Sequence, residues 1–288
     1  MTTPGGASSL WMKVPVALRA IIAGFLVAAV AANVWLLLFR NLDVRLAAVV
    51  EAIFLALFLW WASGAGPPRG AQASRAQAFR RVSLTSSQWL WGLIAALFFA
   101  ATVHAAIVLL FRFVPFPVAA FRQGYDLSFI PSQPLRWVAV IVSAASAGIC
   151  EEIGFRGFMQ QPIEQRHGPS VAILISSLFF LALHLSKGWA LLGMVPIVFG
   201  AGVLLGLVAW SAGSLIPCII GHFVMDVGLF AYWWTGIAGA FAARPIRETG
   251  VDRPFLIACG VFAISLVVLL VAISRCRTAP TDGRAQSD

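Results

Sequence analysis

The chain has 288 residues, of which 60% are hydrophobic and 11% are charged. Soluble globular domains carry about twice that share of charged residues, so this composition excludes them and indicates a polytopic membrane protein. The net charge of +9 comes mostly from arginines in loops and near the ends. This placement favours contact with lipid headgroups and argues against nucleic acid as a partner.

Eight apolar stretches approach the length of about 20 residues that a helix needs to cross a bilayer. They are residues 17–39, 44–63, 89–111, 137–157, 168–186, 189–210, 214–235 and 254–274. We expect all of them to be helical, because the backbone of a membrane span must satisfy its own hydrogen bonds. The fold class predicted is therefore all-α, a polytopic transmembrane helix bundle of about eight spans. In 189–210, Pro196 and several glycines predict a bend or a break.

Polar sequence is too scarce for a separate soluble domain. We predict an N-terminal tail at 1–16, one membrane domain at 17–274 and a polar C-terminal tail at 275–288. The stretch 64–87 carries four arginines and is predicted to be a surface loop with an amphipathic part that lies along the membrane. The Ala- and Arg-rich composition favours a bacterial source, so a cell membrane, here the bacterial inner membrane, is the expected location.

Two adjacent carboxylates and an arginine follow one apolar stretch, at Glu151, Glu152 and Arg156. Ionisable side chains at membrane depth are costly unless they face a cavity or a partner. Glu152 and Arg156 stand four residues apart in the orientation that favours a helical ion pair. Glu151 points about 100° away around the helix, which leaves it available as a general base. Mutual neutralisation of the three charges is an equally good interpretation of this triplet alone.

His184 is the candidate partner of Glu151. If the helix that carries Glu151 continues to a turn at 167–169, then Glu151 and His184 stand about equally far from that turn. Equal distances along an antiparallel hairpin mean equal depth in the membrane. The two side chains are then predicted to face each other inside the bundle, provided that the helix continues through Gly157 and Pro162.

His222 and Asp226 form a second polar pair on one helical face of an apolar stretch. Such a pair indicates an interior cavity, or a buried hydrogen-bonded contact that locks helices together. The presence of the two other polar motifs favours the cavity.

The three motifs together resemble the CPBP family. They read Glu-Glu-x-x-x-Arg at 151–156, Phe-x-x-x-His at 180–184 and His-x-x-x-Asp at 222–226. The family comprises type II CAAX prenyl proteases and bacteriocin-processing or self-immunity membrane proteins. The resemblance covers roughly 134–235, the predicted catalytic core, and implies an intramembrane endopeptidase. We favour the glutamate type, with a metal-dependent protease as the alternative.

Carried over motif by motif, the resemblance implies that Glu151 and His184 activate the attacking water. It implies that His222 and the residue at 226 stabilise the oxyanion. The family motif most often ends in Asn, whereas this chain has Asp226. An ionised Asp cannot donate a hydrogen bond, so Asp226 is protonated, or orients His222, or changes the activity.

The resemblance gives Glu152, Arg156 and Phe180 supporting positions around these groups. Metal is the open alternative, because Glu151, His184 and His222 are zinc-ligand types. The chain lacks the His-Glu-x-x-His spacing of many zinc proteases. We therefore expect no cofactor, with zinc or another divalent metal held by these three residues as the alternative.

The function predicted is hydrolysis of a peptide bond in a membrane-associated or prenylated, CAAX-like protein or peptide precursor. The lipid bilayer and that substrate are the expected partners. The alternative is a non-enzymatic membrane protein, either a proton-coupled transporter or a bacteriocin-immunity or scaffold factor, because membrane carboxylates and histidines also serve proton relays.

Overall fold

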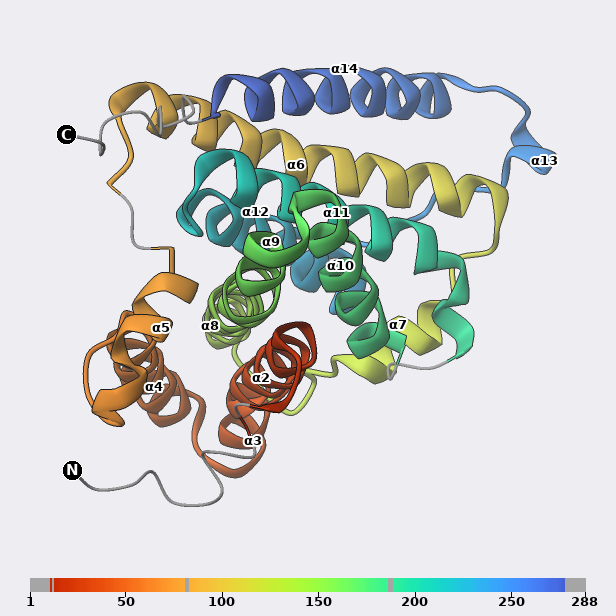
Figure 1. The fold of residues 1–288 in the computed structure, drawn as a ribbon. Coiled ribbons are helices and arrows are strands. Elements are labelled where there is room, and N and C mark those ends of the chain that lie inside the picture. Colours follow the sequence, from red (N-terminus) through yellow and green to blue (C-terminus); the bar gives the residue numbers. More distant parts are fainter. Residues whose placement is uncertain (1–10, 12, 81–82, 186–188, 278–288) are drawn as a thin grey trace, which may run out of the picture.

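The computed structural model describes residue 11 and residues 13–80, 83–185 and 189–277, and within these residues all regular secondary structure is helical (Figure 1). The all-α fold class is confirmed. The α-helices, 3-10 helices and π-helices are, in chain order, α2 (Val16–Ala31), α3 (Val34–Asn41), α4 (Val44–Ala62), η1 (Arg69–Ala71), α5 (Gln72–Ala78), α6 (Ser86–Phe113), α7 (Val118–Gly124), α8 (Gln133–Glu152), η2 (Ile153–Gln160), α9 (Gln161–His167), α10 (Pro169–Leu185), η3 (Trp189–Met194), α11 (Val195–Ala212), α12 (Ile216–Gly228), η4 (Leu229–Trp234), α13 (Ile246–Thr249) and α14 (Arg253–Arg275).

Seven helical segments of the described chain are long and apolar enough to cross a membrane. They correspond, within a few residues at the ends, to seven of the eight predicted stretches. The eighth, 168–186, is helix α10, which has 17 residues and is shorter than the other spans. The chain is therefore a multi-pass membrane protein, and the prediction of about eight spans is confirmed.

The helix of the first motif runs without interruption from Gln133 to His167. It passes Gly157 and Pro162 by widening into the π-helix η2, and Pro162 then falls in the first turn of α9, where proline is tolerated. Gly168 ends the helix with a φ of 82°, a value that suits glycine, and Pro169 begins α10. The hairpin that was expected to bring Glu151 and His184 to one depth is present.

Helix α2 crosses this long helix at two glycines. A Cβ added to Gly24 would lie 2.6 Å from the carbonyl oxygen of Gly154, and one added to Gly154 would lie 2.7 Å from that of Gly24. Only residues without side chains permit this backbone contact. It fixes the first span against the turn that follows Glu151 and Glu152.

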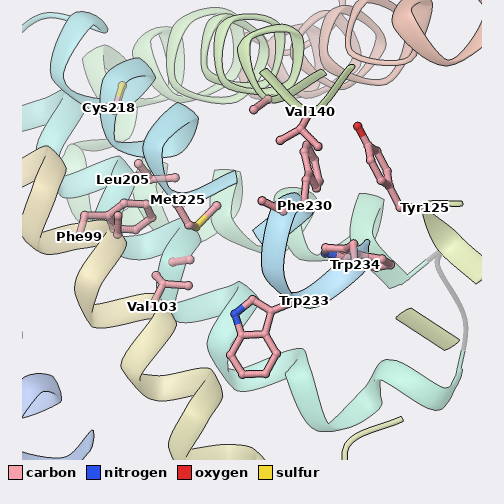
Figure 2. Close-up of a cluster of buried hydrophobic side chains, with 14 of the residues drawn as sticks. Phe99, Val103, Tyr125, Val140, Leu205, Cys218, Met225, Phe230, Trp233 and Trp234 are labelled. Carbon is pink, nitrogen blue, oxygen red and sulfur yellow. The ribbon is translucent and has the colours of Figure 1, made fainter. Parts of the chain in front are cut away.

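The remaining helices enclose the hairpin. Helix α14 runs along α6 at one side of the bundle, and α12 packs between α6 and α8 (Figure 1). Figure 2 shows the apolar cluster at this junction, with Phe99 and Val103 from α6 and Met225 from α12. Phe230 and Trp234 from η4 extend the cluster to the loop residue Tyr125, whose ring stacks on Phe230.

Of two expectations about irregular segments, the break in 189–210 is confirmed and the surface loop in 64–87 needs correction. In 189–210 the break lies at the start, where η3 leads into α11 and Pro196 stands in the first turn of the helix. In 64–87 the surface-loop prediction is wrong for two arginines, because Arg75 and Arg80 are buried. Arg75 donates hydrogen bonds to the backbone carbonyl oxygens of Trp61, Ala65, Gly66 and Pro68.

Arg80 reaches from that same segment to the long helix. It pairs with Glu164 at 2.6 Å and donates to the carbonyl oxygen of Arg156 at 3.3 Å. Much of the two predicted tails lies outside the described residues, at 1–10, 12 and 278–288.

Candidate active site

Glu152 is the centre of a buried polar network. Its Oε1 atom accepts hydrogen bonds from Arg156, at 2.7 Å, and from Nδ1 of His222, also at 2.7 Å. The predicted helical pair of Glu152 and Arg156 is confirmed. The bond from His222 joins α12 to α8 and was not predicted.

A close approach of two helices explains this pairing. A Cβ added to Gly148 would lie 3.1 Å from the backbone nitrogen of Phe223 and 3.2 Å from the carbonyl oxygen of Ile219. Gly148 stands one turn before Glu152, and Ile219 and Phe223 flank His222 in sequence. The missing side chain at Gly148 therefore lets α12 come near enough for His222 to reach Glu152.

Arg156 is held on three sides although its side chain is completely buried. It pairs with Glu152, donates to the carbonyl oxygen of Gly202 on α11 at 3.0 Å, and stands 4.6 Å from the centre of the Phe180 ring. An arginine satisfies these contacts together because its guanidinium is planar and carries five donors. The contacts join α8, α10 and α11 around one cation.

His222 lies between two carboxylates. Besides its bond to Glu152, its Nε2 atom lies 3.4 Å from Oδ2 of Asp226. Both ring nitrogens face carboxylate oxygens, an arrangement that suits the doubly protonated imidazolium. Two carboxylates then balance the charges of Arg156 and His222, and the network is neutral. A neutral, hydrogen-bonded cluster is the form in which charges are tolerated in a low-dielectric interior.

Glu151 points away from this network and lines a cavity of about 100 Å³. His184 and Asp226 line the same cavity, and its other walls are mainly apolar side chains of α6, α10, α11 and η4. A neighbouring cavity of about 240 Å³ is lined by Glu151 and His184 as well. Glu151 and His184 thus meet in one space, in agreement with the register of the hairpin.

The backbone fixes the protonation pattern of His184. Its Nδ1 atom lies 2.9 Å from the carbonyl oxygen of Phe180. A carbonyl only accepts, so Nδ1 carries a proton and donates it. Nε2 is then the nitrogen with the lone pair in the neutral ring, which is the form of histidine that accepts a proton.

Phe180 contacts both the network and the cavity. Its ring lies 4.5 Å from the ring of His184 and 5.9 Å from that of His222, and it carries Arg156 on its face. The side chain is buried and also lines the cavity. Phe180 therefore positions His184 against the buried cation, which matches the supporting place that the motif implies.

The seven residues of the three motifs divide into two groups. Glu151, His184 and Asp226 line the cavity with Phe180, whereas Glu152, Arg156 and His222 form the network behind them. Asp226 and Phe180 touch both groups. The catalytic roles that the resemblance gives to these residues stay predictions.

Polar contacts of two further residues, Glu51 and His104, were not found from the sequence. Ser146 donates to Oε1 of the buried Glu51 at 2.8 Å, which joins α4 to α8. His104 accepts from Trp233 at 3.2 Å and faces the carbonyl oxygen of Met225 at 3.1 Å. Glu51 and His104 stood alone in apolar stretches, and no local pattern points to partners more than 90 positions away.

A metal site finds no support in the arrangement of the described side chains. Across that part of the chain, no three His, Cys, Asp or Glu residues are grouped as ligands of one ion. The alternative set of Glu151, His184 and His222 is divided, since His222 turns to Glu152 and Asp226 while the other two line the cavity. The residues present therefore do not fit a metal as they stand.

These findings define a multi-pass membrane protein with carboxylates and histidines gathered at an internal cavity. Residues 133–228 match the family model described as type II CAAX prenyl endopeptidase, Rce1-like. A third of the chain is therefore similar to Rce1-like endopeptidases, and the resemblance to the CPBP family that the three motifs predicted is confirmed over these residues. No curated protein and no solved structure matches the chain.

Proposed function

We propose that this protein is an intramembrane endopeptidase that hydrolyses a peptide bond of a membrane-associated or prenylated, CAAX-like protein or peptide precursor. The observation that carries the proposal is the shared cavity of Glu151 and His184, which the motifs bring together from α8 and α10. The family of the domain supports the reaction type. The apolar walls of the cavity support an apolar substrate segment.

In this mechanism the cavity holds a water molecule between Glu151 and His184. One of the two bases takes a proton as the water oxygen attacks the substrate carbonyl carbon, and a C–O bond forms. The carbonyl oxygen becomes an oxyanion. The C–N bond then breaks, the abstracted proton passes to the leaving amine, and a carboxylic acid and an amine are the products.

The network behind the cavity supplies the positive charge for the oxyanion. Nε2–H of His222 points toward Asp226 across a long contact of 3.4 Å. A donor in such a long contact can turn partly to a stronger acceptor, and the oxyanion is one. In this step Asp226 orients His222. This is the second of the three explanations given above for an Asp where the family motif usually has Asn.

In this proposal Glu152 and Arg156 hold the neighbouring side chains in place. Glu152 holds His222 through Nδ1, and Arg156 ties Glu152 to α11 and to the Phe180 ring. A group that must stay fixed during catalysis needs such support from residues that are themselves held.

The experiment compares the termini of membrane proteins in cells that carry the wild type or Glu151→Gln. The matched control is Glu248→Gln, which changes a half-exposed carboxylate on α13. Termini that depend on the wild type and the control but vanish with Glu151→Gln support proteolysis and name the substrate. Unchanged termini, from a variant that is inserted and folded, contradict the proposal and favour transport or immunity by binding.

Two further predictions belong to the proposal. Activity of the purified protein is expected to survive treatment with a chelator, because the described residues do not group as metal ligands. The cell membrane is the expected location, with the bacterial inner membrane as the prediction from composition.

A further inference from the structure

A histidine outside the three motifs joins two elements that border the site. His104 is on α6, and its ring contacts both α12 and η4. Its Nδ1 atom lies 3.2 Å from the indole nitrogen of Trp233, and its Nε2 atom lies 3.1 Å from the carbonyl oxygen of Met225. Trp233 has its indole nitrogen turned toward α6 (Figure 2). One ring therefore connects three helical elements.

The two partners determine which nitrogen of His104 carries the proton. An indole N–H only donates, so Nδ1 of His104 accepts with its lone pair. A carbonyl oxygen only accepts, so Nε2 carries the proton and donates it. His104 is thus a neutral ring with both nitrogens bonded. An apolar side chain at this position would remove the acceptor of the buried indole N–H of Trp233.

A glycine leaves the space that the ring of His104 occupies. A Cβ added to Gly228 would lie 2.5 Å from Nε2 of His104 and 2.8 Å from its Cε1 atom, closer than real Cβ atoms approach other heavy atoms. Gly228 is the last residue of α12, and the π-helix η4 begins at the next residue. Short π-helical turns of this kind are frequent at functional sites. The ring of His104 thus packs at the junction where α12 widens into η4.

Helix α12 is held by polar bonds from two sides. It packs against both α6 and α8. On the side of α8, His222 donates to Glu152, and on the side of α6, the carbonyl oxygen of Met225 accepts from His104. Two bonds to different neighbours fix the rotation of α12 about its axis, and with it the direction of Asp226.

The contacts of His104 lie directly behind the cavity of about 100 Å³ that Glu151 lines. His104 and each of its two partners have a neighbour in sequence that lines this cavity. These neighbours are Val103, Asp226 and Trp234. The ring of His104 is not itself among the lining groups, so it acts on the site through the elements that it holds.

We propose that His104 is a positioning residue for the proteolytic reaction, which fixes the rotation of α12 and so directs His222 and Asp226 at the oxyanion. The inference rests on the proposed function and adds a residue of α6, outside the stretch 133–228 that matches the family model. A misplacement of about 1 Å can cost about a hundredfold in rate. Because the oxyanion forms only in the transition state, the loss should fall on kcat and leave KM unchanged.

The test measures kcat and KM of the purified full chain in detergent with a prenylated fluorogenic peptide. His104→Leu is expected to lower kcat by about 10–100-fold and to leave KM within about twofold of the wild type. His104→Gln keeps a donor near the place of Nε2, and His104→Asn keeps an acceptor near the place of Nδ1. Each of these two variants should recover part of the loss. His167→Leu is the matched control, because His167 is exposed at the end of α9, and it should preserve kcat.

Trp233→Phe tests the same contact from the other side, because it removes the indole N–H and keeps an aromatic ring. It should lower kcat several-fold, and its effect should not add fully to that of His104→Leu in the double variant, since both changes break one bond. Fully additive effects overturn the proposal, as does a rise in KM without a fall in kcat. If His104→Leu does not fold, the three milder variants decide, and a wild-type kcat in all of them overturns the proposal.

A thiol probe tests the position of α12 without proteolysis. If the wild type cleaves no peptide, the proposed function fails for this substrate, and this probe decides the role of His104. Leu229→Cys places a thiol at the cavity, on the first residue of η4. Its rate of modification by a small charged methanethiosulfonate, followed by mass spectrometry, should change several-fold when His104→Leu is added and stay the same with His167→Leu. Equal rates with both changes show that His104 does not fix α12 and overturn the proposal.

Discussion

His222 donates from Nδ1 to Oε1 of Glu152 at 2.7 Å, across seventy positions of sequence, and both side chains are buried. This bond distinguishes Glu152 from the adjacent Glu151, although the two residues look alike in the sequence. Glu152 belongs to the network that holds α8, α11 and α12 together, whereas Glu151 faces the cavity. The two residues should therefore respond differently to the same substitution.

Glu151→Gln is expected to abolish cleavage and to leave the fold intact. Removal of a general base lowers rates by about 10²–10⁴-fold. Glu152→Gln should instead destabilise the protein by about 3–5 kcal/mol, because it leaves buried positive charge without its partner. Peptide cleavage and thermal unfolding of both variants in the same detergent check the contrast. Equal losses of stability would contradict it.

Arg156→Lys tests the shape of the cation separately from its charge. A lysine keeps the charge but cannot bond Glu152 and the carbonyl oxygen of Gly202 in the same fork. We expect a loss of about 1–3 kcal/mol in the free energy of unfolding. Arg156→Leu, which removes the charge, should cost about 3–5 kcal/mol. A lysine variant as stable as the wild type would show that the fork has no role.

Asp226→Asn restores the residue that the family motif usually has. His222 can donate to the side-chain oxygen of the new asparagine as it does to the carboxylate of Asp226, so we expect activity within about tenfold of the wild type. Asp226→Leu has a similar shape and no polar atom, and it should lose most activity because His222 is left without its second partner. The ratio of kcat for the two variants is the measurement. A leucine variant as active as the asparagine variant would remove Asp226 from the mechanism.

Gly154→Ala is expected to destabilise the protein by about 1–3 kcal/mol, because the new methyl group would overlap the backbone of α2. Gly200→Ala is the control on a neighbouring helix. No atom lies within 4 Å of a Cβ added there, and alanine favours a helix over glycine by about 1 kcal/mol. Thermal unfolding in detergent should therefore move in opposite directions for the two variants. A neutral Gly154→Ala would mean that α2 is able to shift.

Asp252 predicts a dependence of stability on pH. Hydrogen bonds from Arg112 and from the backbone nitrogen of Phe255 lower the pKa of Asp252 from its ordinary value of 3.8. Because the pKa of the folded state is lowered, the contribution to stability is complete above about pH 4 and is lost as the pH falls through the lowered value. Unfolding followed between pH 7 and pH 3 should show a smaller acid loss for Asp252→Asn than for the wild type. Identical profiles would contradict this.

The sequence predicted those parts of the site that depend on one helix or one hairpin. The pair of Glu152 and Arg156 follows from a spacing of four residues, and the shared cavity of Glu151 and His184 follows from equal distances to a turn. Both are local properties of helical geometry. The shared depth of Glu151 and His184 also requires the helix to continue through Gly157 and Pro162. A π-helix provides this continuation, and no residue pattern predicts it.

The same reasoning could not predict contacts between helices that are distant in sequence. The bond from His222 to Glu152 depends on how closely α12 approaches at Gly148, and the bond from Ser146 to Glu51 depends on the rotation of α4. Neither the depth of a helix nor its rotation about its axis is encoded in hydrophobic periodicity alone. The same limit explains why the buried Arg75 and Arg80 looked like surface residues.

The contact of Gly24 with Gly154 joins α2 to the stretch of the chain that matches the family model. The stretch 133–228 that matches the family model begins after α2, yet the backbone of α2 lies directly on it, and Arg80 and Glu51 attach to it from outside as well. A fragment that consisted of the family domain alone would lose all three attachments. Chimaeras between relatives should therefore exchange the first spans together with the motif-bearing helices. The stretch that matches the family model is shorter than the set of helices that pack together as one unit.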